Sequence, residues 1–308
     1  MSEGSEKSGG FSVIKFDGAP VEKLIEVVSN AIGTLYKPKA IRNEADAEAY
    51  KVEVMAIAES KKKLIEFENQ SELAERAAKR FINTEINRQL NIETVSDKSV
   101  KYLPENVSDQ PVSKDWRNRF FDKVQDISDS DMQELWAKIL AGEIAKPNSS
   151  SLRMLDILGN ISLQEAETFA RLCSMASSKA VVYKLKLGDF EKFNFTFNDL
   201  LVLQELGLVF ANDMLMSRIS SGPYLKVGDK VTSRTFSVPV GNIACTFMAP
   251  ENKLQEENLD LSNVVFTKAG QELCKFIQQD LNKNYFKSWL AEQAELGYVI
   301  HGGDYFNE

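Results

Sequence analysis

Four carboxylates gather in one short stretch in the middle of the chain: Asp126, Asp129, Asp131 and Glu134. Carboxylates act as general acids and bases and are ligands that Mg²⁺ prefers. The simpler interpretation is helix capping, because Ser-Asp-Ser-Asp before an apolar helical run is typical of a helix start, with Ser128 or Ser130 as the expected cap. We assign no catalytic or metal residue and keep these four as the candidates for a magnesium site.

Other patterns that carry chemistry are missing from the sequence. The chain has one histidine, His301, close to its C-terminal end, whereas most side chains that exchange protons near pH 7 are histidines. The spacings H-x-x-x-H, C-x-x-C, G-x-x-x-x-G-K-[ST] and G-x-S-x-G do not occur, and these hold zinc, phosphate or a nucleophilic serine. The sequence favours a protein that is not an enzyme, and no cofactor is expected.

The three cysteines, Cys173, Cys245 and Cys274, lie far apart in the sequence. An odd number of cysteines without close pairs suits a reducing compartment better than a disulfide framework. We expect three buried thiols.

Basic residues flank an aromatic segment, with Arg117, Arg119 and Lys123 close to Trp116. Basic residues interleaved with aromatic ones bind single-stranded nucleic acid by charge and stacking. Burial is the favoured explanation of the aromatic residues, because Trp116, Phe120 and Trp136 have helical spacing, and we expect the two helices that carry them to share one core. The net charge of -8 disfavours a nucleic-acid partner. Trp116 and Arg119 stay as candidate interaction residues.

The elements that must position these residues are mostly helices. One helix is predicted behind Pro20 and ends near Gly33. From Asn43 to about Leu90 there is neither proline nor glycine, which predicts a very long helix that either breaks near 69–71 or protrudes. Its apolar stripe is the candidate surface for a partner, either a second copy of the chain or another protein, and consists of Tyr50, Val54, Ile57 and Leu64.

Composition shifts divide the chain into four regions. We expect a flexible tail over 1–18, a long-helix region over 19–103, a central helical bundle over 112–180 and an α+β module over 181–308. The expected fold class is therefore mainly α with a smaller α+β C-terminal part. In that part, a helix over 197–206 followed by strand-like runs is similar to a winged-helix module.

No basic region followed by an apolar core opens the sequence, and no run of about 18 apolar residues occurs. A secretory signal and a transmembrane helix are therefore not expected. We expect a cytoplasmic protein.

Three segments together resemble a bacterial family of unknown function, number 2806. They are 32–38 (Ile-Gly-Thr-Leu-Tyr-Lys-Pro), 115–121 (Asp-Trp-Arg-Asn-Arg-Phe-Phe), and 135–143 (Leu-Trp-Ala-Lys-Ile-Leu-Ala-Gly-Glu) with 152–155 (Leu-Arg-Met-Leu). The family is more distantly similar to abortive-infection alpha-type proteins. That similarity implies a role in bacterial antiviral defence and carries no catalytic residue.

Three hypotheses about function follow from the sequence. The first is a non-enzymatic, oligomerising interaction or sensor protein. The second is a winged-helix regulator that reads DNA through 197–206, where the exposed candidates are acidic or amide residues rather than lysine or arginine. The third is a magnesium-dependent nuclease or nucleotide-processing enzyme built on the four carboxylates.

Overall fold

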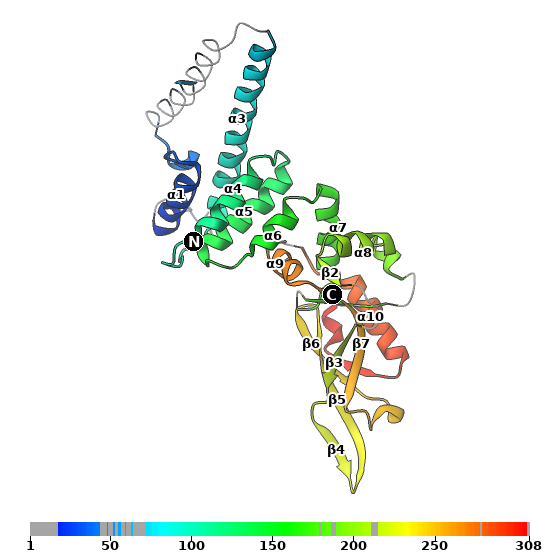
Figure 1. Cartoon of the computed structure of the whole chain (residues 1–308). Coiled ribbons are helices and arrows are strands. Elements are labelled where there is room, and N and C mark those ends of the chain that lie inside the picture. The colour runs from blue at the N-terminus through cyan, green and yellow to red at the C-terminus, as the bar shows by residue number, and fades with distance from the viewer. Residues whose placement is uncertain are drawn as a thin grey trace, which may run out of the picture. The chain divides into compact units, whose positions relative to one another are not determined.

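The computed structural model describes residues 18–43, 48, 52, 55–56, 59, 63, 72–178, 180–185, 189–210, 215–277 and 279–306. The chain divides into two compact units, Met1–Ser149 and Ser150–Glu308 (Figure 1). The four-region division expected from the sequence stays a prediction. Among the described residues, no helix is both long enough and apolar enough to cross a membrane.

Helices form the described part of the first unit. They are α1 (Ala19–Ile32), α3 (Glu72–Ser99), α4 (Lys114–Val124) and α5 (Ser130–Ala145). Pro20 lies in the first turn of α1, and Gly33 ends that helix in the left-handed conformation at φ 77°, which glycine adopts without a Cβ penalty. Asp129 caps α5, rather than Ser128 or Ser130, because its side chain accepts from the amides of Asp131 and Met132.

The core of this unit contains the aromatic cluster expected from the sequence. Phe120 stacks on Trp116 with ring centroids 4.9 Å apart. Phe120 and Trp136 pack edge to face, with ring centroids 5.2 Å apart. Trp116, Phe120 and Trp136 are all buried. Large apolar groups at three- and four-residue spacing on α4 and α5 therefore bury one another.

A polar network attaches the segment after α1 to α3. The Tyr36 hydroxyl donates to Asp97 Oδ1 at 2.7 Å, and Arg42 Nη2 lies 3.1 Å from Glu93 Oε2. Burial raises the pKa of Glu93, and the Arg42 guanidinium opposes this rise. The segment that follows α1 thus leads into a buried ion pair.

The second unit combines helices with sheets. Its helices are α6 (Leu152–Leu158), α7 (Leu163–Ser174), α8 (Phe197–Glu205), α9 (Lys268–Phe276) and α10 (Lys283–Glu295). Its strands are β1 (Val181–Tyr183), β2 (Val209–Phe210), β3 (Met216–Ser220), β4 (Tyr224–Val227), β5 (Lys230–Val240), β6 (Ile243–Met248), β7 (Asn258–Phe266) and β8 (Val299–His301). Capping boxes open α7, at Ser162 and Glu165, and α8, at Thr196 and Asp199.

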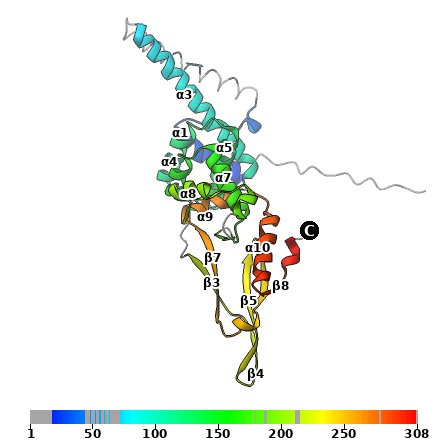
Figure 2. The same ribbon diagram turned by 90° about the vertical axis from the view of Figure 1, so that its right-hand side faces the viewer.

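The strands form two antiparallel sheets of four strands each. In the first, β7 pairs with β1, β2 and β3, and in the second the order is β4-β5-β6-β8. Burial alternates along the second half of β5, as expected for a strand with one face in the core. The helix α10 lies beside the second sheet (Figure 2). The ring centroids of its Trp289 and of Phe247 on β6 are 5.8 Å apart.

The fold class expected from the sequence, mainly α with a winged-helix-like module, is wrong, because two four-stranded antiparallel sheets make this an α+β fold. The sequence interpretation treated each strand-like run as part of a small hairpin. Instead, β5 spans 11 residues, and β7 spans nine and pairs with three strands from distant parts of the chain. Pairing between distant segments leaves no local pattern in a sequence.

Candidate functional site

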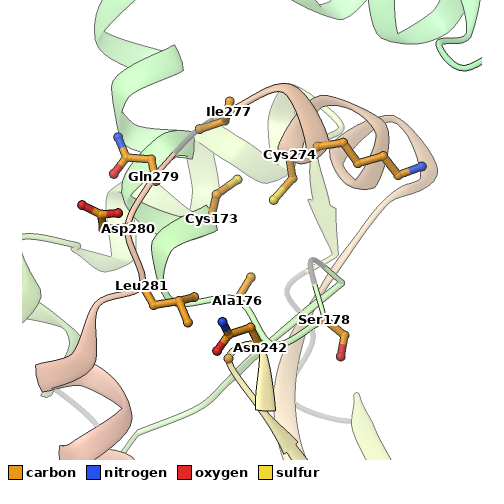
Figure 3. Close-up of a pocket in the computed structure, with 11 residues that line it drawn as sticks. Cys173, Ala176, Ser178, Asn242, Cys274, Ile277, Gln279, Asp280 and Leu281 are labelled. Atoms are coloured by element: carbon orange, nitrogen blue, oxygen red, sulfur yellow. The ribbon is translucent and has the colours of Figure 1, made fainter. Parts of the chain in front are cut away.

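An open pocket in the second unit is lined by four segments of the chain. Cys173 comes from the end of α7, Cys274 from α9, and Asn242 from the turn between β5 and β6. The connection from α9 to α10 supplies Leu281, among others, and the volume is about 880 Å³. Figure 3 shows these side chains around the pocket.

Backbone hydrogen bonds fix the walls of this pocket. The amide of Ser178 donates to the carbonyl of Gly241 at 3.1 Å, and the amide of Gly241 donates to Ser177 Oγ at 3.0 Å. On the other side, the amide of Asn282 donates to the carbonyl of Ser174 at 2.9 Å. The end of α7 is therefore held to both the β5–β6 turn and the start of α10.

Gly241 is required at that turn for two reasons. Its φ is 59°, and a Cβ there would lie 3.0 Å from Leu281 Cδ1. A side chain would meet both backbone strain and a tight contact. The close approach brings the β5–β6 turn against the α9–α10 connection and closes one wall of the pocket.

The reactive groups on this surface are two thiols. Cys173 and Cys274 are 8% and 3% exposed, and their side chains turn toward one another in Figure 3. Both are thiols rather than parts of a disulfide. Two thiols that line one pocket open to solvent are candidates for a disulfide once an oxidant reaches either sulfur.

Cys245 differs from this pair. It lies in β6 with no exposed surface, and it does not line the pocket. Burial raises the pKa of its thiol, which lowers the fraction of reactive thiolate. Cys245 therefore serves as a control cysteine when the reactivity of Cys173 and Cys274 is measured.

The lining carries few groups suited to acid–base catalysis. Among the described residues of the lining, the ionisable side chains other than the thiols are Lys275 and Asp280, and the other polar groups are the hydroxyl of Ser178 and the amides of Asn242 and Gln279. This set suits binding by hydrogen bonds and reversible sulfur chemistry.

Three of the four carboxylates singled out in the sequence have separate partners in the first unit, and the fourth, Asp131, is exposed. Asp129 Oδ1 accepts from the amides of Asp131 and Met132 at 3.0 and 2.9 Å. Asp126 pairs with Arg88 at 2.8 Å, and Glu134 contacts Lys101 and Tyr102. Within the part of the chain that the structure describes, no group of three or more His, Cys, Asp or Glu is placed to hold a metal ion.

The candidate interaction residues fall into two groups. Trp116 is buried against Phe120, while Arg119 is exposed on α4. The stripe residues Tyr50, Val54, Ile57 and Leu64 lie outside the described residues.

Sequence reasoning missed the pocket because its two thiols are distant in the chain. It predicted buried thiols, which they are, but not that α7 and α9 bring two of them together. The only local signal was the Ser162-to-Glu165 capping box, which located α7 without indicating what its far end meets.

A family model described as "Protein of unknown function (DUF2806)" matches residues 75–289. The match includes the segments at 115–121, 135–143 and 152–155, and the segment at 32–38 lies outside it. No curated protein and no solved structure matches the chain.

Proposed function

We propose that this chain, which belongs to the DUF2806 family, is a non-enzymatic sensor protein whose sensing element is the pair Cys173 and Cys274. One observation carries the proposal: two thiols from separate helices turn toward one another at the wall of a pocket open to solvent (Figure 3). Two such thiols respond to an oxidant by forming a disulfide bond, which a reductant can break again.

The sensing reaction is a two-electron oxidation by a peroxide. A thiolate of the pair attacks hydrogen peroxide, takes up one oxygen as a sulfenic acid, and water leaves after proton transfer. The second thiol then attacks that sulfur, the S–O bond breaks, a second water leaves and the disulfide forms. Overall, two thiols and one hydrogen peroxide give one disulfide and two waters. We propose a cytosolic location with this cycle, since glutathione there would return the pair to thiols.

The position of Cys274 suggests how oxidation reaches the rest of the unit. It lies near the end of α9, directly before the connection that lines the pocket and leads to α10. A bond from Cys274 to Cys173 fixes the end of α9 to the end of α7. The connection between α9 and α10 is therefore the segment whose freedom the disulfide restricts.

Counting thiols by mass spectrometry tests the proposal. The full chain is treated with hydrogen peroxide, denatured, alkylated and weighed. We expect two of the three cysteines to escape alkylation and to become available again after reduction. The Cys245→Ser variant should still form the disulfide between Cys173 and Cys274. The Cys173→Ser variant should form no intramolecular disulfide. Oxidation of all three cysteines at one rate would contradict a dedicated pair.

The wider setting of the sensor is also part of the proposal. We also propose a role in bacterial antiviral defence, which rests only on the resemblance to abortive-infection alpha-type proteins suggested by the sequence. A protein partner, foremost a second copy of the chain, is supported by the apolar stripe of the long-helix region and by exposed Leu73 and Leu90 on α3. Light scattering coupled to size-exclusion chromatography tests self-association. A monomer across micromolar concentrations would contradict it.

A further inference from the structure

Arg234 is a buried cation on β5 whose observed partners are all neutral. Its side chain is 6% exposed. Its Nε donates to the carbonyl of Leu254 at 2.7 Å, and its Nη1 donates to Ser221 Oγ at 2.7 Å. Its guanidinium also lies over the ring of Tyr224, 5.1 Å from the centroid.

In the described part of the chain, no carboxylate lies within ion-pair distance of Arg234. Arg218 on β3 shows the usual arrangement: it is exposed and donates two hydrogen bonds, of 2.9 and 3.0 Å, to Asp260. Burying a guanidinium without a negative partner is costly. A negative ligand would supply the charge that such a group lacks and would form a strong charge-assisted hydrogen bond with it.

A polar pocket of about 450 Å³ lies against this arginine. It is formed by the face of the β4–β5 hairpin that carries Tyr224 and Lys226, by Ser220 and Ser221, and by the segment from Gln255 to Asn258. Nη2 of Arg234 makes no hydrogen bond to the described residues, and it is not among their enclosed atoms that lack a partner. That donor is therefore open to solvent, and Arg234 is one of the residues that line the pocket.

A second cation stands on the same side of the hairpin. Lys226 Nζ lies 5.3 Å from the centroid of the same Tyr224 ring. Lys226 is exposed, and no carboxylate among the described residues pairs with it. Two positive groups around one aromatic ring, with two serine hydroxyls beside them, present donors in the way that oxyanion sites do.

The pocket also contains two carboxylates, Asp229 and Glu257. Together with Lys226 and Arg234 they bring the formal charge of the lining close to zero. A polyanion such as nucleic acid would meet both attraction and repulsion here, whereas a small oxyanion can reach the arginine alone.

We infer that this pocket binds a small molecule bearing a phosphate or carboxylate group, with Arg234 Nη2 and Lys226 Nζ as the donors to its oxyanion. The Tyr224 ring holds the two cations apart and provides an apolar wall for the body of the ligand. The inference is independent of the thiol pair, since none of these residues lines the thiol pocket.

Isothermal titration of the full chain with sodium phosphate and with sodium acetate tests the inference, against sodium chloride at equal ionic strength. We expect saturable binding of at least one of the two anions. Binding of phosphate alone identifies a phosphate group as the ligand chemistry, and binding of acetate identifies a carboxylate. The absence of saturable binding of either anion would overturn the inference.

Three variants assign the binding to the pocket. Arg234→Gln should weaken it about tenfold or more, the usual size of a lost charged hydrogen bond, and Lys226→Gln should weaken it by a smaller factor. Arg218→Gln, which removes an exposed and paired arginine, should leave the affinity unchanged. Circular dichroism checks each fold; if Arg234→Gln unfolds, Lys226→Gln carries the test, because its side chain is exposed. Equal weakening by Arg218→Gln would show a general charge effect and contradict the site.

Discussion

The indole of Trp289 on α10 is stacked on the phenol ring of Tyr183 on β1, with ring centroids 4.4 Å apart and planes 14° from parallel. The Tyr183 hydroxyl donates to the carbonyl of Pro239 on β5 at 2.9 Å, and its own carbonyl accepts from the Tyr285 hydroxyl at 2.5 Å. Strands from both sheets therefore meet at α10. This contact holds in place the helix that follows the pocket connection.

Removal of the indole should destabilise the second unit strongly. Trp289 is 1% exposed, and replacing a buried aromatic side chain by alanine costs about 3 to 5 kcal/mol. Urea unfolding of Trp289→Ala measures the loss, and Trp289→Phe, which keeps a ring, should lose less. A Trp289→Ala protein as stable as its parent would contradict the stacking as a source of stability.

The aromatic cluster of the first unit gives a parallel prediction. Trp136 is fully buried against Phe120, so Trp136→Ala should also cost about 3 to 5 kcal/mol. Thermal melting followed by circular dichroism checks it, with the exposed Lys114→Ala on α4 as a control that should change little. A Trp136→Ala variant that melts like the parent but loses a partner would instead make this tryptophan a binding residue.

A substitution at Gly270 tests how closely α9 packs against the residue that precedes β2. A Cβ at this position would lie 2.1 Å from the carbonyl oxygen of Leu208, so the backbone would have to move. Gly270→Ala should therefore cost about 3 kcal/mol or more. Gly228→Ala is the control, because φ there is 61° but nothing lies within 4 Å, and the expected cost is about 1 kcal/mol. Chemical denaturation of both variants makes the comparison, and equal losses would refute the tight contact.

The buried Glu93 predicts a pH dependence of stability. Burial raises its pKa in the folded chain, so the folded state holds this proton at a higher pH than the unfolded state, whose glutamates titrate near about 4.3. The stability that it contributes is present below the unfolded pKa and is lost as the pH rises through the folded pKa.

Glu93→Gln removes that titration. As the pH rises from about 4 to 7, the variant should gain stability relative to the parent. Unfolding by urea at a series of pH values measures the difference, and the exposed Glu26→Gln on α1 gives the baseline for loss of a carboxylate. If instead the parent gained stability relative to Glu93→Gln over the same pH range, the ion pair with Arg42 would outweigh burial in setting the pKa of Glu93.

Local elements were predictable from the sequence because their signals are local. Pro20 and Gly33 bounded α1, and the Ser162-to-Glu165 and Thr196-to-Asp199 spacings preceded α7 and α8. The cap of α5 was misplaced by one residue, because aspartate and serine cap equally well and the segment 128–131 alternates between them.

The sheets and both pockets depend on contacts between distant residues. β7 finds its partners β1, β2 and β3 only in the folded unit, and Cys274 and Cys173 line one pocket only after α7 and α9 have packed into that unit. Arg234 resembles any strand arginine in the sequence. Its burial comes from Leu254 and Ser221, which belong to other segments.

Hydrogen exchange of the reduced and the peroxide-treated chain tests the thiol sensor most directly. If the disulfide joins α7 to α9, amides in the connection from Ile277 to Asn282 should exchange more slowly in the oxidised protein. Dithiothreitol should restore the faster exchange. Cys173→Ser should show no such change, and Cys245→Ser should show the full change. Identical exchange in this segment before and after oxidation of the parent protein would contradict the pair as a sensing element.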